Sequence, residues 1–141
     1  MFASLITAIL VVNMRITSIA LILAPSGTYL RVHLTKYNLP NQFPYGTFIA
    51  NLFACIVLYV SVLLLGQTLD RHSCALVSAI IPGFCGCLST LSTFILELKK
   101  LPLVLTYKYA ASSLLLAQVF AFVVIGSYQF SGHSIEQVCA I

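Results

Sequence analysis

Residues 83–94 read GFCGCLSTLSTF and lie within a hydrophobic run long enough to cross a bilayer. Pro82, Gly83 and Gly86 come first, and the hydroxyl side chains of Ser89, Thr90, Ser92 and Thr93 follow. Proline and glycine interrupt helices, so the helix is predicted to break here and to leave backbone carbonyls without helical partners. Irregular backbone at membrane depth is tolerated only where it is buried in protein or lines a watery cavity. The stretch therefore predicts an ion site or pore.

The composition of the chain is that of a membrane protein. Of its 141 residues, 60% are hydrophobic and 7% are charged, whereas ordinary soluble domains have about 25% charged residues. At about 20 apolar residues per crossing, the chain has room for four helices and for no soluble catalytic domain. We predict a single all-α domain that is not an enzyme. The three histidines, His33, His72 and His133, are expected in loops away from the hydroxyl cluster, which argues against a nucleophile and base pair.

Four spans are predicted, at residues 15–31, 46–66, 74–98 and about 108–128, the third being the broken one. Pro25 and Gly27 are expected to loosen the second half of the first span. Residues 14–130 form the predicted channel-like domain, and residues 131–141 form a C-terminal tail. The apolar residues 1–13 either extend the first helix or remain from an earlier hydrophobic segment.

Polar and small side chains form ridges on these spans. In the second span, Gly46, Ala50 and Ala54 make a small-residue ridge that lets a neighbouring helix approach closely, and Thr47, Asn51 and Cys55 make the polar ridge beside it. Asn51 either hydrogen-bonds a neighbouring helix or faces a conducted species. In the fourth span, Tyr109, Ser113, Ala117 and Ala121 share one face. Together the ridges predict a track of hydroxyl groups through the protein.

Three of the five cysteines are predicted to pack rather than to react. Cys55, Cys85 and Cys87 fall inside spans, where thiols behave as small apolar groups. Cys85 and Cys87 are spaced C-x-C without a nearby histidine or carboxylate, which is a weak metal signal. No disulfide framework is expected.

The basic residues predict the orientation of the chain. Arg31, Lys36, Lys99, Lys100 and Lys108 lie on the side of the first and third connections, and Arg15 and Arg71 lie on the other side. By the positive-inside rule, both termini are predicted outside. Because the net charge of +4 comes from such scattered span-end residues, it does not predict nucleic-acid binding.

Three segments resemble the Fluc (CrcB-type) fluoride channels and their eukaryotic relatives, the FEX fluoride exporters. They are GTYLR at residues 27–31, PYGTFIAN at residues 44–51 and GFCGCLSTLSTFILE at residues 83–97. The resemblance covers roughly residues 16–128. It implies an antiparallel dimer or pseudodimer, with a structural sodium ion held by the backbone carbonyls of Gly86 and Ser89.

The resemblance also assigns a fluoride pathway. Asn51 would donate a hydrogen bond to fluoride, and Arg31 would attract anions into a vestibule. The remaining pathway residues implied are Ser92, Thr93, Phe94, Glu97, Tyr109 and Ser113. The positive ring edge of Phe94 can contact an anion, whereas Leu91, which stands where the family has a second phenylalanine, cannot.

The function predicted is passive, fluoride-selective conduction that exports fluoride across the plasma membrane and confers fluoride resistance. Because the basic residues are biased to one side, the chain resembles the second half of a eukaryotic exporter. Its partner would be a second copy or a homologous first half in antiparallel orientation. The alternative is a non-conducting helical scaffold or assembly subunit whose hydroxyl groups join helices.

Overall fold

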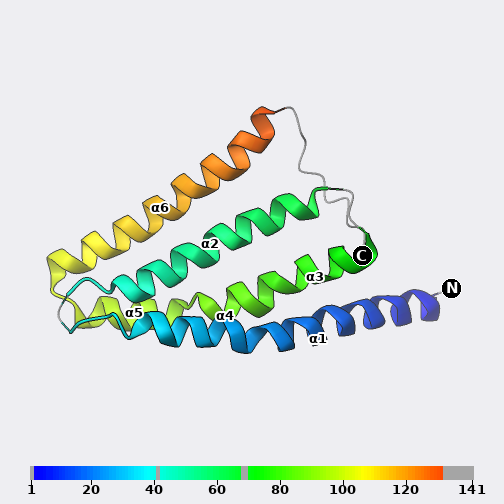
Figure 1. The fold of residues 1–141 in the computed structure, drawn as a ribbon, viewed down its shortest axis with the longest axis horizontal. Coiled ribbons are helices and arrows are strands. Elements are labelled where there is room, and N and C mark those ends of the chain that lie inside the picture. The colour runs from blue at the N-terminus through cyan, green and yellow to red at the C-terminus, as the bar shows by residue number, and fades with distance from the viewer. Residues whose placement is uncertain (1, 41, 68–69, 132–141) are drawn as a thin grey trace.

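The computed structural model describes residues 2–40, 42–67 and 70–131, and this part of the chain is wholly helical apart from its connections. Its elements are α1 (Phe2–Thr35), α2 (Tyr45–Leu65), α3 (Arg71–Ile80), η1 (Ile81–Cys85), α4 (Gly86–Leu88), α5 (Leu91–Lys100) and α6 (Leu103–Phe130). Figure 1 shows α1 and α6 on the two outer sides, with α2 and the segment from α3 to α5 between them. The all-α prediction is confirmed for these residues.

Within the described residues, three helical stretches are long and apolar enough to cross a membrane: Tyr45–Leu65, His72–Lys100 and Leu103–Phe130. They correspond to the second, third and fourth predicted spans. The helix of the fourth predicted span, α6, begins at Leu103, earlier than predicted and directly after Pro102. His33 and His72 lie in the end turns of α1 and α3, so the prediction that they lie in loops is wrong.

The first helix is longer and more regular than the sequence predicts. It runs without a break from Phe2 to Thr35 with Pro25 inside it, so residues 2–13 extend the first helix. The prediction that Gly27 loosens this helix is wrong. Gly27 is instead a position at which α1 packs closely against η1. A Cβ atom there would lie 2.5 Å from the carbonyl oxygen of Phe84, so only glycine lets α1 approach η1 this closely.

The same kind of contact recurs on the other side of this interface and on α2. A Cβ atom on Gly83 would lie 2.5 Å from the carbonyl oxygen of Ala20, and one on Gly46 would lie 2.0 Å from that of Leu34. Gly46, Ala50 and Ala54 are all buried, which confirms the predicted small-residue ridge. At Gly46 this ridge meets α1, and at Ala50 and Ala54 it packs with Cys85 and Leu88 of η1 and α4.

The predicted break is confirmed, but it lies later in the stretch than proline and glycine suggest. Pro82 and Gly83 lie within η1, a single π-helical turn that absorbs the proline ring without ending the helix. The backbone leaves the helix at Ser89 (φ −81°, ψ 148°) and Thr90 (φ −152°, ψ 121°). The chain then resumes a helical conformation in α5.

The cysteines agree in part with the prediction. Cys55, Cys85 and Cys87 are free thiols, and Cys85 packs with Ala50, Ala54 and Leu88 in the buried core. Cys74, near the start of α3, is disulfide-bonded, which differs from the expectation that the chain has no disulfide framework. Spacing along the chain cannot reveal which cysteines the fold brings together.

Candidate functional site

Asn51 connects the middle of α2 to the break before α5. The backbone N–H of Thr90 donates to Asn51 Oδ1 at 3.1 Å. In a continuous helix this N–H would donate to the carbonyl of Gly86, so the bond replaces a helical one. Because the Thr90 N–H can only donate, it defines which end of the Asn51 amide is the oxygen. This bond therefore uses the oxygen of the Asn51 amide and not its NH₂ group.

Asn51 also lines a small hollow between α2 and α6. The hollow is about 40 Å³ in volume and is lined by Phe48, Asn51, Leu52, Cys55, Ser113 and Ala117. A space of this size holds a single water-sized species. The hydroxyl of Ser113 already donates to the carbonyl of Tyr109 at 2.7 Å. The Asn51 amide is therefore the stronger candidate donor at this position.

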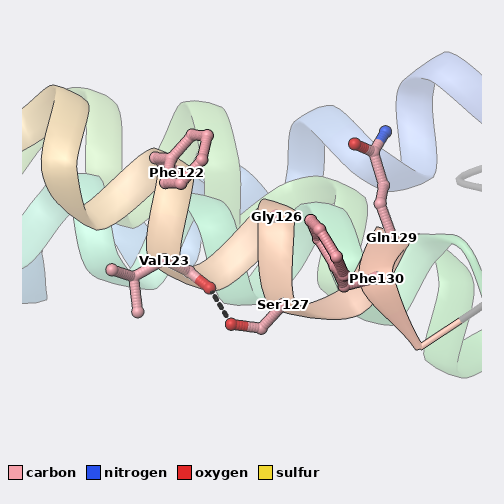
Figure 2. A pocket seen from close by; sticks show the side chains of 6 residues that line it. All are labelled: Phe122, Val123, Gly126, Ser127, Gln129 and Phe130. Carbon is pink, nitrogen blue, oxygen red and sulfur yellow. Dashed lines mark hydrogen bonds between the residues drawn. The ribbon is translucent and has the colours of Figure 1, made fainter.

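A larger hollow lies at the other end of α6 but has no comparable chemistry. It has a volume of about 720 Å³, and Figure 2 shows the residues that line it: Phe122, Val123, Gly126, Ser127, Gln129 and Phe130. All six belong to one helix, and the hydroxyl of Ser127 donates to the carbonyl of Val123. Because this hollow is an open surface groove, we locate the candidate site at the small hollow instead.

The carboxylate of Glu97 gathers three donors close to where α1 ends and α2 begins. Its Oε1 accepts from the Thr47 hydroxyl at 2.6 Å and from Asn38 Nδ2 at 2.9 Å. Its Oε2 accepts from the Tyr109 hydroxyl at 2.9 Å. A carboxylate inside a candidate span is costly unless it is paired with donors, and these three meet that need. We call Asn38, Thr47, Glu97 and Tyr109 the Glu97 cluster.

Aromatic rings surround Tyr109, the one fully buried aromatic residue among those described. The ring centroids of Phe94, Phe43 and Phe48 lie 4.9, 5.2 and 6.5 Å from that of Tyr109. The Phe43 and Tyr109 rings meet edge to face, at an interplanar angle of 81°. These contacts hold Tyr109 in position for its bond to Glu97.

The structure brings together some of the predicted pathway residues and not others. Phe94, Glu97 and Tyr109 lie at the Glu97 cluster, and Asn51 and Ser113 lie at the small hollow. Ser92 is exposed, and its hydroxyl bonds that of Thr90 at 2.9 Å. Thr93 and Arg31 are partly buried, and no hydrogen bond found among the described residues joins either one to the two groups.

Sequence reasoning misses two members of the Glu97 cluster as site residues. The sequence places Asn38 only in a polar connection, and it places Thr47 only on the polar ridge of the second span, without assigning it to the site. The nearest signal is the pairing of a polar ridge on α2 with a lone acid in a span, since an acid in hydrocarbon requires donors. Nothing in the local pattern indicates that Asn38 is one of them.

These features define a helical membrane protein with a broken span and a polar site beside the break. The family model described as CrcB-like protein, Camphor Resistance (CrcB), matches residues 18–127. The chain belongs to this family. The prediction of a CrcB-type resemblance is thereby confirmed.

Curated relatives of the chain are fungal proteins. It is 34% identical over 123 residues to Fluoride export protein 1 of Candida albicans, covering 79% of this chain and 32% of that protein. It is 34% identical over 125 residues to Fluoride export protein 1 of Saccharomyces cerevisiae (79% and 33%) and 32% identical over 124 residues to that of Neurospora crassa (79% and 22%). The chain thus spans about a third or less of their length. No solved structure matches it.

The bond between Tyr109 and Glu97 can be tested by a substitution that keeps the aromatic ring. Tyr109→Phe preserves the ring contacts but removes one donor to the carboxylate, and it is expected to lower the free energy of unfolding by about 1–2 kcal/mol. The measurement is unfolding of the purified protein in a denaturing detergent. Tyr107→Phe is the matched control, because Tyr107 is 69% exposed on the same helix. Equal stability of the two variants would contradict the assigned bond.

Proposed function

We propose that this chain is one half of a passive, fluoride-selective channel that exports fluoride. The observation that carries the proposal is the fixed orientation of Asn51. Its oxygen accepts the Thr90 N–H at 3.1 Å, and its amide lines the small hollow. The NH₂ group is then available as an anion donor without a full positive charge. Membership of the CrcB family and the names of the fungal relatives support fluoride as the ion.

The chemistry of the site suits a small, strongly hydrated anion. Such an ion enters protein only where compact donors replace its water. The Asn51 amide is one such donor, and the Phe94 ring edge is another positive contact. The hydroxyl groups of Tyr109 and Ser113 are engaged within the chain, so they would have to rotate to contribute. A proton relay would need several acids within the spans, and Glu97 is the one acid inside a described span, which supports passive conduction.

We infer that α1 crosses the membrane as the fourth span and that the chain functions with an antiparallel partner. α1 packs along α2, α3, η1 and α4, as expected for a member of one bundle. α5 has no buried residue, and its Leu91 is 72% exposed. A second domain would cover this face and complete a pathway beside Phe94. A second copy or a homologous first half would serve, and the length of the fungal relatives supports the latter.

We further propose that the break holds a structural sodium ion through the backbone carbonyls of Gly86 and Ser89. The extended conformation of Ser89 and the use of the Thr90 N–H by Asn51 support this, because neither carbonyl continues an ordinary helix. Unwound backbone carbonyls are the ligands that sodium takes in membrane proteins. Gly86 is exposed, which suits a site shared with a partner domain. The ion would neutralise the carbonyl dipoles of two breaks.

The proposed orientation places the α1–α2 and α5–α6 connections inside, in the plasma membrane. Figure 1 shows both connections at one end of the bundle and the α2–α3 connection at the other. Besides the bias in basic residues, the disulfide bond of Cys74 supports this orientation, because Cys74 lies near the start of α3. Disulfide bonds persist in oxidising compartments and are rare in the cytosol.

The alternative of a non-conducting scaffold has support of its own. Several hydroxyl groups, among them those of Ser61, Ser89 and Ser113, donate to carbonyls of their own segment and so serve the packed structure. Asn51 differs from them, because among the described residues its hydrogen bond uses only the oxygen of the amide. The channel and scaffold proposals therefore diverge at Asn51.

Fluoride efflux from liposomes tests the channel. Asn51→Asp keeps an oxygen for the Thr90 N–H but replaces the NH₂ donor with a negative oxygen. Efflux is expected to fall at least about tenfold, since a lost donor to an anion is worth about 1.5–3 kcal/mol. Gln67→Ala, at an exposed position beyond α2, is the matched control. A chloride gradient reports selectivity.

The liposomes contain the purified chain, first alone and then together with a homologous first half. Folding is checked by the unfolding transition in detergent. Well-folded wild-type protein that releases no fluoride in either arrangement would refute the channel. Equal efflux from the wild type and Asn51→Asp would refute the role of the amide and favour the scaffold.

Sodium binding is testable without any flux measurement. The melting temperature of the purified protein is expected to be several degrees higher in sodium chloride than in N-methylglucamine chloride, because an ion that binds only the folded state stabilises it. Potassium chloride serves as the control for ionic strength. Identical melting in all three salts would count against a resident sodium ion.

The orientation is testable in intact cells that express the chain. An epitope tag in the α2–α3 connection is expected to bind antibody without permeabilisation. A tag in the α5–α6 connection should bind only after permeabilisation. The reverse pattern would overturn the orientation, and binding of neither tag in intact cells would overturn the plasma-membrane location.

A further inference from the structure

The side chain of Asn38 makes four hydrogen bonds, two at each end of its amide. Its Oδ1 accepts from the backbone N–H groups of Gly46 at 2.7 Å and of Thr47 at 3.3 Å. Its Nδ2 donates to the Thr47 hydroxyl at 2.8 Å and to Glu97 Oε1 at 2.9 Å. Asn38 lies in the connection after α1, so one side chain joins this connection to α2 and α5.

The first pair of bonds caps α2. The first N–H groups of a helix have no partners within the helix, and the residue at the N-cap, Pro44, supplies no side-chain bond. Asn38 supplies the missing oxygen from outside the helix. The fit requires Gly46, because a Cβ atom there would lie 2.8 Å from Asn38 Oδ1. Gly46 is therefore required both for the cap of α2 and for the close packing of α2 on α1.

The second pair of bonds reaches α5, which is otherwise weakly held. No residue of α5 is buried, and among the described elements α5 packs mainly against α6. Glu97 is the residue through which α5 is hydrogen-bonded to α2 and to the connection before it. Because Phe94 is one turn away on the same helix, a shift of Glu97 would move the Phe94 ring.

We propose that Asn38 is a positioning residue for fluoride passage. It does not contact the ion. It holds the Glu97 carboxylate against the first turn of α2, and so keeps α5, with its Phe94 ring, aligned with Asn51 one turn further along α2. This inference rests on the proposed function. A residue that only capped α2 would need its oxygen and not its NH₂ group, so the two roles make different demands on the amide.

The test exchanges donor and acceptor between the two side chains. Asn38→Asp keeps the oxygen that caps α2 but sets a second carboxylate against Glu97. Glu97→Gln either places its new NH₂ group against the NH₂ group of Asn38 or, in the opposite orientation, loses the oxygen that accepts from the Tyr109 hydroxyl. In the double variant, the new glutamine NH₂ can donate to the new aspartate, which restores the bond with its direction reversed.

Fluoride efflux from liposomes is expected to fall about tenfold in each single variant, the loss expected for one hydrogen bond to a charged group. The double variant should conduct faster than either single variant, which independent losses cannot produce. Unfolding of the same four proteins in detergent should show the same recovery. That second readout is measured on the chain without any ion gradient.

The outcomes separate the inference from the function on which it rests. If the wild type conducts and Asn38→Asp conducts equally well, the positioning role is wrong and the channel stands. The positioning role is also wrong, and the channel again stands, if the double variant is no better than the product of the single losses. If the folded wild type is silent alone and with a homologous first half, the channel fails and the positioning role fails with it.

Discussion

The structure depends on how a backbone break is tolerated inside a span. At Ser89 and Thr90 the chain leaves the helix, and its polar groups lose their ordinary partners where lipid offers none. Asn51 meets this need with its oxygen. An unpaired backbone N–H in such a place costs several kcal/mol, so the bond is a condition for the break to exist. This bond also requires α2 to lie beside the break.

Close approach between backbones places α2 and the break near enough to each other for hydrogen bonds to form. Gly27 and Gly83 let α1 lie against η1, and Gly46 lets α2 lie against the end of α1. In lipid, helices are held by van der Waals packing, which rewards such contact. The π turn at η1 absorbs Pro82 and rotates the following residues relative to a plain helix. The glycines therefore position the break as much as they permit it.

The sequence predicts those parts of the fold that depend on hydropathy and on the spacing of small residues. The helical class, the broken third span and the small-residue ridge of Gly46 all follow from hydropathy and spacing, and all are found. The break lies within the predicted stretch, at Ser89 and Thr90, although proline and glycine alone do not say which turn leaves the helix. The prediction misses the continuity of α1 through Pro25 for the same reason.

The candidate site is only partly predictable, because its bonds join residues far apart in the chain. Glu97 is expected to need partners, yet Asn38 lies 59 residues before it and no local pattern marks the pair. Likewise, the sequence permits two roles for Asn51, and the structure assigns one of them, a hydrogen bond to a neighbouring segment, to its oxygen. A single sequence offers no measure of such long-range pairing.

The two amides explain why this chain uses asparagine where aspartate would also satisfy the backbone. Aspartate caps N–H groups as well as asparagine does. At Asn51, however, a carboxylate would face the proposed anion, and at Asn38 it would face Glu97. An amide accepts from the backbone with its oxygen and still donates with its nitrogen, without adding charge. In the proposed anion site, an amide therefore stabilises irregular backbone without making the local potential negative. Glu97, the carboxylate at this site, is surrounded by three donors for the same reason.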